Sequence, residues 1–203
     1  MGIVLPHLYM KKLLFASITL LFLSGTVQSQ HVNLGIKGGL NGYTVSGENT
    51  PGYNPKLGFH AGILGHIHIN PRFALQPELI FSTQGTTYKA NGLDNKLNLN
   101  YLNIPLNFQY MFDNGFRLQA GPQLGILASA KLKTGDIKSD TKSNFKIADI
   151  GLTVGFSYVK PTTGLGFDIR YNHGLSSINS NNSIQAYNRG VQLGLFYLFG
   201  HKS

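Results

Sequence analysis

Apolar and polar residues alternate with a period of two over most of the chain after residue 30, and this pattern constrains the fold more than any other feature. From 101 to 112, for example, every even position is Leu, Ile, Phe or Tyr, while the odd positions include Asn, Pro and Gln. This period is typical of β-strands with two unlike faces, because amphipathic helices repeat every 3.6 residues instead. Eight such stretches predict eight strands, at 33–45, 57–69, 73–88, 101–112, 116–130, 147–159, 165–172 and 189–199.

The composition agrees with an all-β chain and excludes several classes of function. Of 203 residues, 25 are Gly and only 12% are charged, which argues against a helical bundle, and 42% are hydrophobic, which argues against disorder. The absence of Cys excludes thiol catalysis, Cys-ligated metals and a lipid-anchored lipoprotein. The formal net charge of +9 could indicate nucleic acid, but the cations form no dense stripe, so we expect no nucleic-acid partner.

Short turns and long connections alternate strictly between the predicted strands. The short turns lie at 70–72, 113–115 and 160–164, and the longer polar connections lie at 46–56, 86–96, 131–146 and 177–188. In an antiparallel meander, this alternation places every long loop on one rim and every short turn on the other, as in outer-membrane barrels. The sequence therefore predicts an all-β fold, an eight-stranded antiparallel up-and-down transmembrane β-barrel.

The direction in which the apolar faces point separates a membrane barrel from a soluble one. Large apolar residues follow one another on one face, with aromatic residues towards the strand ends, while Gly and amides dominate the other face. This favours apolar faces turned towards lipid; a secreted soluble barrel with reversed faces is the alternative. Pro77, Pro105 and Pro122 lie inside predicted strands, where each removes a ladder donor, so we expect β-bulges and local flips of the faces there.

The two ends of the chain indicate export and assembly. Lys11 and Lys12 precede an apolar run over 13–23 and then small residues, which predicts a signal peptide over 1–29, cleaved after Ser29, and a barrel domain over 30–203. The apolar run is too short for a membrane-spanning helix, and the true start is Met1 or Met10. At the other end, Tyr197 and Phe199 resemble the C-terminal aromatic signal that barrel-assembly machinery reads. The predicted location is the bacterial outer membrane.

Four short segments in a fixed order resemble a known family. They are 35–41 (GIKGGLN), 75–79 (LQPEL), 101–106 (YLNIPL) and 121–125 (GPQLG), and together they resemble the PorT-like outer-membrane β-barrel family. The resemblance covers nearly all of the chain after the leader and implies a small outer-membrane barrel. The founding member of that family is linked to protein secretion across the outer membrane. No catalytic residues or cofactors follow from the resemblance.

Charged residues on the polar face are the first group of candidate site residues. We expect a lumen network formed by Lys37, Glu78, Arg117, Asp149, Asp168, Arg170 and Arg189. Unpaired buried charges are costly, so these side chains are expected to pair whatever the function is. On the outer rim, cations are expected to contact the phosphorylated headgroups of lipopolysaccharide and other outer-membrane lipid: Lys131, Lys133, Lys138, Lys142 and Lys146.

The remaining motifs give weaker indications. His60, His66 and His68 share one strand face, but a third ligand and groups that would orient the imidazoles are not identifiable, so no metal site and no cofactor are predicted. An enzyme would need His173 with Ser176 or Ser177 and an acid supplied by another strand. We therefore predict a non-enzymatic protein with a structural or surface-interaction role through its long loops, including a surface or secretion partner of unknown identity. Narrow-pore passive transport and a lipid-modifying enzyme are the alternatives.

Overall fold

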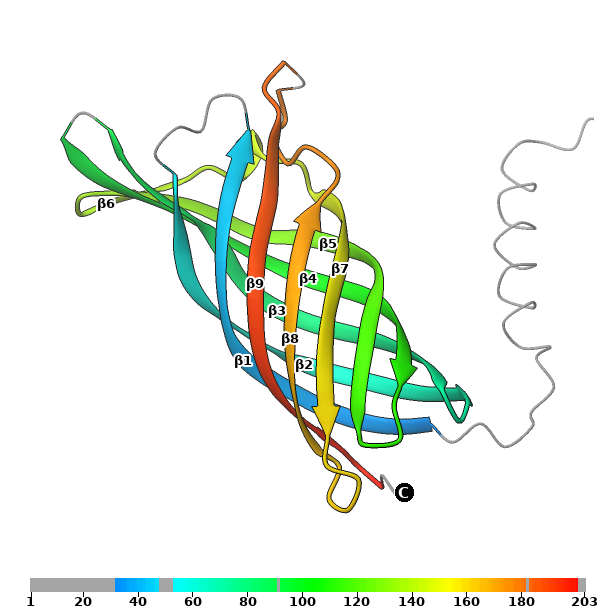
Figure 1. Ribbon diagram of the computed structural model, residues 1–203. Helices are drawn as coiled ribbons and strands as arrows, with labels where there is room; N and C mark the ends of the chain where they lie inside the picture. Colours follow the sequence, from blue (N-terminus) through cyan, green and yellow to red (C-terminus); the bar gives the residue numbers. More distant parts are fainter. Residues whose placement is uncertain (1–31, 48–52, 91, 182, 201–203) are drawn as a thin grey trace, which may run out of the picture. The chain divides into compact units, whose positions relative to one another are not determined.

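Nine strands account for most of the residues that the computed structural model describes, which are 32–47, 53–90, 92–181 and 183–200 (Figure 1). The strands are β1 (Val32–Gly47), β2 (Asn54–Asn70), β3 (Phe73–Ala90), β4 (Leu93–Met111), β5 (Phe116–Thr134), β6 (Ile137–Asp140), β7 (Ala148–Val159), β8 (Leu165–Gly174) and β9 (Ala186–Leu198), with one 3-10 turn, η1 (Lys142–Asn144). No helix in the described part of the chain is long and apolar enough to cross a membrane. The predicted signal peptide and its cleavage site lie outside the described residues.

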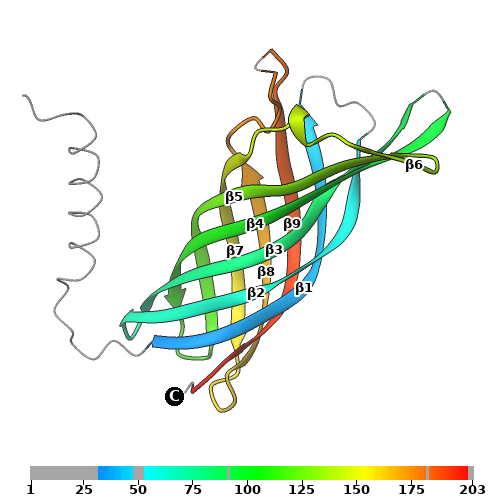
Figure 2. The same ribbon diagram turned by 180° about the vertical axis from the view of Figure 1, so that it is seen from behind.

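Eight of these strands close into an antiparallel ring. The order is β4-β3-β2-β1-β9-β8-β7-β5, and pairing of β4 with β5 closes the ring, while β6 pairs only with β5. Neighbours in the ring are consecutive in sequence apart from the inserted β6, and β9 returns to pair with β1 (Figure 2). The predicted eight-stranded up-and-down barrel is therefore confirmed.

The faces of the strands point as a membrane barrel requires. Outward-facing positions around the ring are large, apolar and exposed, and we call them the apolar belt; they include Ile36 and Leu40 on β1 and Leu193 on β9. Inward-facing positions alternate with them and are buried and mainly polar, such as Gln76 and Asn107. This arrangement is opposite to that of the soluble barrel considered as an alternative.

The polarity of both faces of β4 and β5 inverts near the outer rim, whereas on β3 only the outward face changes, from apolar to polar. Phe81, Leu102 and Ile126 are neighbours across these strands and form the outer edge of the apolar belt. Beyond them, the outward face carries polar side chains, and the inward face of β4 carries Leu99 and Tyr101, which are buried. Strands that leave hydrocarbon for water need polar groups outside, so this inversion marks where they leave the membrane.

Beyond this edge, the strands continue as a four-stranded sheet that we call the outer extension. It consists of 83–90 of β3, 93–101 of β4, 127–134 of β5, and β6. The connections predicted at 86–96 and 131–146 are therefore mostly strand rather than loop. Strands β1 to β5 have 16 to 19 residues each, whereas β7 to β9 have 10 to 13, so the extension rises from one side of the barrel (Figure 1).

The prolines do not produce the predicted bulges. Pro77 lies opposite Leu106, and the register is unchanged past it, as it is past Pro105 and Pro122. Shifts occur instead next to Asn100 in the β4–β5 pair and at two places in the β2–β3 pair. The β4–β5 shift coincides with the inversion of polarity. Before the shift, the even positions of β5 face outwards; the strand then has one extra residue, so the even position Ala130 faces inwards.

Candidate functional site

Four charged side chains from three strands meet at the centre of the lumen. Arg170 of β8 donates two hydrogen bonds to the carboxylate of Glu78 of β3, at 2.7 and 2.5 Å. The Nε of Arg170 lies 2.8 Å from Oδ2 of Asp168, its neighbour on β8, and Lys37 of β1 donates to the same oxygen. Lys37 Nζ is also 3.8 Å from Glu78 Oε2. The two cations balance the two anions, so this ion cluster is neutral, which lowers the cost of burying it.

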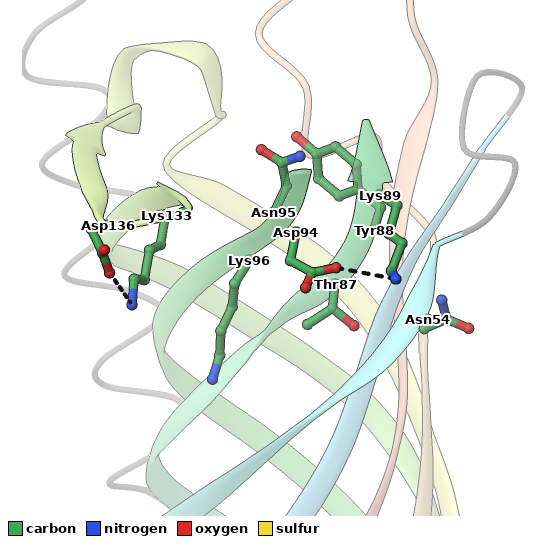
Figure 3. A pocket seen from close by; sticks show the side chains of 10 residues that line it. Asn54, Thr87, Tyr88, Lys89, Asp94, Asn95, Lys96, Lys133 and Asp136 are labelled. Atoms are coloured by element: carbon green, nitrogen blue, oxygen red, sulfur yellow. Dashed lines mark ion pairs between the residues drawn. The ribbon is translucent and has the colours of Figure 1, made fainter. Parts of the chain in front are cut away.

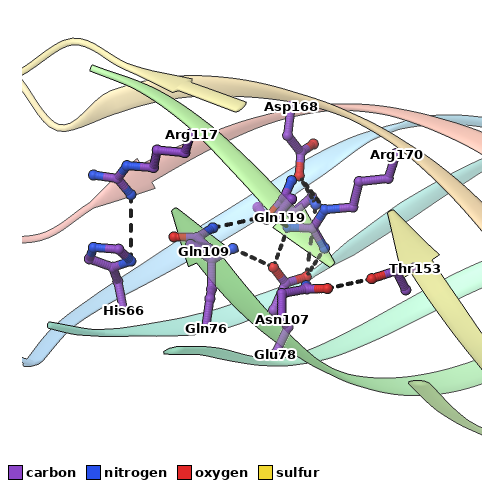
Figure 4. Close-up of polar contacts among 11 residues, drawn as sticks. His66, Gln76, Glu78, Asn107, Gln109, Arg117, Gln119, Thr153, Asp168 and Arg170 are labelled. Carbon is purple, nitrogen blue, oxygen red and sulfur yellow. Dashed lines mark hydrogen bonds and ion pairs between the residues drawn. The ribbon is translucent and has the colours of Figure 1, made fainter. Parts of the chain in front are cut away.

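Amide side chains extend the ion cluster across the barrel (Figure 4). Gln76 donates to Glu78 at 2.6 Å, and Gln109 donates both to Gln76, at 2.9 Å, and to Gln119, at 3.0 Å. Gln119 in turn accepts from Arg170 at 3.2 Å. These inward positions of β3, β4, β5 and β8 therefore form one connected layer of polar contacts that spans the lumen.

The lumen is occluded at three levels. The four side chains of the ion cluster are 0–2% exposed, so no passage as wide as a water molecule runs past them. At the outer mouth a hydrophobic cluster is buried: Val45, Leu97, Leu99, Tyr101, Leu127, Ala130, Ile178 and Ala186. A smaller cluster packs inside the barrel towards the rim of short turns: Leu64, Val159, Phe196 and Leu198. Side chains therefore fill this narrow barrel, as expected for eight strands.

Three other predicted lumen residues occupy different places. Asp149 is buried under the outer cluster, where it accepts hydrogen bonds from Ser176 at 3.1 Å and Asn188 at 2.8 Å. Arg117 is buried and lies 3.5 Å from Nδ1 of His66, apart from the ion cluster (Figure 4). The prediction that Arg189 faces the lumen is wrong: Arg189 is exposed, because it shares its strand face with the lipid-facing residue two positions on.

The residues of the enzyme alternative are not brought together. His173 shares the outward face of β8 with Tyr171, and its Nδ1 lies 3.4 Å from the Tyr171 hydroxyl. Ser176 donates to Asp149 instead, and Ser177 donates to the carbonyl of Ile184. A nucleophile and its base must lie within hydrogen-bond reach, and these contacts do not provide such a pair.

The histidines of β2 also divide between environments. His60 is buried beside the ion cluster, while the ring centroids of His66 and His68 lie 4.5 Å apart, edge to face. Within the described residues, no group of three or more His, Cys, Asp or Glu side chains has the arrangement of a metal site.

The predicted lysine cluster is partly assembled on the outward face of the outer extension. Lys133 of β5 lies directly opposite Lys96 of β4 on one side and Lys138 of β6 on the other, so three lysines form one cross-strand row. Lys131 lies on the same face of β5. Lys142 and Lys146 are elsewhere, in the segment between β6 and β7. Sequence reasoning missed Lys96, because only the register of β4 on β5 places it in the row.

Carboxylates lie at two places on the outer extension: Asp94 and Asp136 near its tip (Figure 3), and Asp140 of β6 directly opposite Lys131. Lys89 pairs with Asp94 at 3.7 Å, and Lys133 pairs with Asp136 at 3.8 Å, and both carboxylates are exposed. Lys96 points away from both carboxylates. Such exposed pairs contribute little to stability, about 0–1 kcal/mol each. Lys96, Lys131, Lys133 and Lys138 outnumber Asp136 and Asp140 on this face, so its net charge is positive.

Two titratable groups beyond the apolar belt have shifted pKa values. Burial lowers the pKa of Lys56, whose ammonium donates to the carbonyl of Gln84 at 3.0 Å, and the nearby charge of Lys96 lowers this pKa further. Burial raises the pKa of Tyr53, which stacks on Tyr88 with ring centroids 4.6 Å apart. Lys56 and Lys96 line the same groove at this rim.

Aromatic side chains surround the rim of short turns. Phe73, Tyr110 and Phe112 form one group of contacting rings, with centroids 4.9–5.3 Å apart. Tyr197 and Phe199, the predicted assembly signal, face outwards at this rim with centroids 5.3 Å apart. Rings at this height are typical of the aromatic girdle of outer-membrane barrels.

Comparisons with known proteins agree with this geometry. A family model described as outer membrane protein beta-barrel domain matches residues 28–180. The crystal structure of Neisserial surface protein A is similar, with a TM-score of 0.53, 16% identity, and coverage of 82% of this chain and 98% of that one. No curated protein sequence matches the chain.

The attachment invasion locus protein Ail of Yersinia pestis is similar to about the same degree. Its crystal structure has a TM-score of 0.50 and 13% identity and covers 82% of this chain and 98% of that one. A second structure of Ail, in complex with the heparin analogue sucrose octasulfate, has a TM-score of 0.52 and 12% identity, with coverage of 83% and 99%. Identities this low establish a shared fold alone.

Proposed function

We propose that this chain, which belongs to the outer membrane protein beta-barrel domain family, is a non-conducting barrel that presents the outer extension at the cell surface as an interaction surface. The observation that carries the proposal is the outer extension itself. Its strands continue well past the apolar belt, and the inward face of its base packs on a hydrophobic cluster, so strand pairing and this packing hold its outward face in place. A rigid polar surface suits recognition, since little ordering entropy is lost on binding.

The occluded lumen supports the non-conducting part of the proposal. A neutral ion cluster and two hydrophobic clusters fill the interior, whereas a pore would need a wetted path lined by polar groups. Ail is an attachment invasion locus protein, and one of its structures holds a heparin analogue. Both facts are consistent with this role but come from a protein of 12–13% identity. The resemblance to PorT-like barrels rests on four short segments, and the proposal does not include a role in secretion.

Cysteine labelling of intact cells tests the orientation that the proposal requires. The chain has no native Cys, so a single introduced Cys reports its own accessibility. Asn98→Cys on the outer extension should react with a membrane-impermeant maleimide on intact cells. Asn114→Cys, in a short turn at the other rim, is the matched control and should react only after lysis. The reverse pattern would refute the proposed orientation.

Planar-bilayer recording tests the closed lumen. Purified protein should give no conductance steps, because the ion cluster blocks the passage of ions and water. Reproducible unitary steps from the wild-type protein would contradict the proposal and favour the alternative of narrow-pore transport.

A further inference from the structure

We infer that the outward face of the outer extension binds the phosphorylated saccharide headgroup of an outer-leaflet glycolipid, of the lipopolysaccharide type. This inference rests on the proposed orientation of the barrel and names the partner of the proposed interaction surface. The binding site is a groove of about 590 Å³ that we call the basic groove. Five lysines contribute to its lining, and the lining contains no carboxylate; Lys96, Lys131, Lys133 and Lys138 dominate it, with Asn98 and Phe59.

The lysine row is unfavourable unless an anion binds to it. Like charges directly opposite one another on neighbouring strands destabilise a sheet, and Lys96, Lys133 and Lys138 occupy three consecutive opposite positions. Neighbouring strands are ~4.8 Å apart, so the three Cα atoms span only about 10 Å. Among the described residues, Lys96 and Lys138 of the row have no carboxylate within ion-pair distance, whereas Lys133 pairs with Asp136 and the neighbouring Lys131 lies opposite Asp140. A phosphorylated ligand would neutralise this row.

The height of the basic groove selects the kind of lipid. Ile126, at the edge of the apolar belt, lies opposite Leu102, and Lys131 lies opposite Asn98, so four residues of β4, or about 13 Å at ~3.3 Å per residue, separate them along the strand. With a strand tilt of about 40°, this places Lys131 roughly 10 Å above the hydrocarbon. The headgroup layer of a typical bilayer is only about 5–8 Å thick on each side. A headgroup that reaches the row must therefore be larger than that of a phospholipid, and a phosphorylated oligosaccharide is large enough.

The apolar part of the basic groove favours a membrane-anchored ligand over a soluble polyanion. Leu57 and Phe59 of β2 line it and are 83% and 52% exposed, and the ring of Phe59 lies beside Phe81, at the edge of the apolar belt. The groove therefore adjoins the apolar belt, where acyl chains lie. A lipid would place its chains on the apolar belt and its phosphates at the lysine row.

Binding to defined vesicles tests the inference. Full-length protein, purified in detergent from the outer membrane, is titrated with phosphatidylcholine vesicles that contain lipopolysaccharide with a phosphorylated inner core. The test variant is Lys96→Gln/Lys133→Gln/Lys138→Gln, and the control is Lys142→Gln/Lys146→Gln, which changes lysines outside the basic groove. A lysine near an anionic surface contributes about fivefold to binding, so the triple variant should bind at least tenfold more weakly and the control less than about threefold more weakly.

Four ligand comparisons identify the source of the phosphate. Dephosphorylated lipopolysaccharide should bind at least tenfold more weakly than the phosphorylated glycolipid, because it lacks the anions that the lysines attract. Phosphatidylglycerol vesicles should also bind at least tenfold more weakly, because a phospholipid headgroup does not reach the lysine row. The delipidated saccharide and a sulfated oligosaccharide should also bind weakly; equal or tighter binding of either would overturn the membrane-anchored ligand in favour of a soluble polyanion. Unchanged binding by the triple variant, with a normal heat-dependent gel shift, would overturn the site itself. None of these outcomes depends on the cysteine labelling or the conductance result, so the proposed function fails or stands separately.

Discussion

Replacing Glu78 with Gln should destabilise the barrel strongly, because Glu78 is one of only two anions in the central ion cluster. The change keeps the shape of the side chain but leaves Lys37 and Arg170 with Asp168 alone, so one buried cation loses its counter-charge. Breaking a buried pair by removing one partner costs about 3–5 kcal/mol. Coulomb's law gives a similar value, about 4 kcal/mol for unit charges 4 Å apart at an effective dielectric constant of 20.

A compensating variant separates the charge effect from a packing effect. Glu78→Gln/Lys37→Met removes one anion and one cation, so Asp168 and Arg170 remain as a neutral pair 2.8 Å apart. We expect this double variant to recover at least half of the stability lost by Glu78→Gln. Lys37→Met alone leaves an unbalanced anion and should also be destabilised, so the two single effects should not add.

Urea unfolding of protein reconstituted in phosphatidylcholine vesicles measures these differences. The chain has no Trp, so far-ultraviolet circular dichroism and tyrosine fluorescence follow unfolding, and gel mobility without boiling reports the folded fraction. A loss of less than about 1 kcal/mol for Glu78→Gln, below the roughly 3–5 kcal/mol expected, would refute the reasoning. So would a double variant no more stable than the single one, because charge balance would then not control the stability of the cluster.

Three further substitutions test other parts of the fold. At Gly194 a Cβ would lie 2.5 Å from Asp168 Oδ1 and 2.9 Å from Lys37 Cε, so Gly194→Ala should cost about 1–3 kcal/mol in the same unfolding assay. Gly38→Ala is the control and should be close to neutral, because the atom nearest to a Cβ at Gly38 would be 3.7 Å away. Leu99→Ala, within the buried hydrophobic cluster at the outer mouth, should cost about 2–5 kcal/mol and increase protease cleavage within the outer extension. Unchanged cleavage would contradict the packing of the extension on this cluster. Leu193→Arg, on the apolar belt, should cost about 2–4 kcal/mol in vesicles. Ser139→Arg, at an exposed position of the outer extension opposite Leu132, should have little effect, and equal costs would contradict the assigned edge of the belt.

Most of the barrel could be predicted from the sequence because a period of two is a local property of the chain. Side chains of a strand alternate between faces whatever its neighbours are, so the alternation predicts the lipid-facing and lumen-facing sides of β4 and β9 directly. The alternation of short turns and long connections then determines the up-and-down order. The same parity, applied consistently, also places Arg189 on the lipid-facing side with Val191.

Long-range pairing decided what the sequence pattern could not. The ion cluster brings together Lys37, Glu78, Asp168 and Arg170 from three strands that lie far apart in the sequence. They meet only because their strands close into a ring, and ring closure is a property of the whole sheet. The row of Lys96, Lys133 and Lys138 depends on the register of three strands and on a bulge next to Asn100, which local composition does not reveal. The alternation in sequence therefore determined a membrane barrel with a polar interior, and only the tertiary structure decided which charges balance inside it and which lysines gather outside.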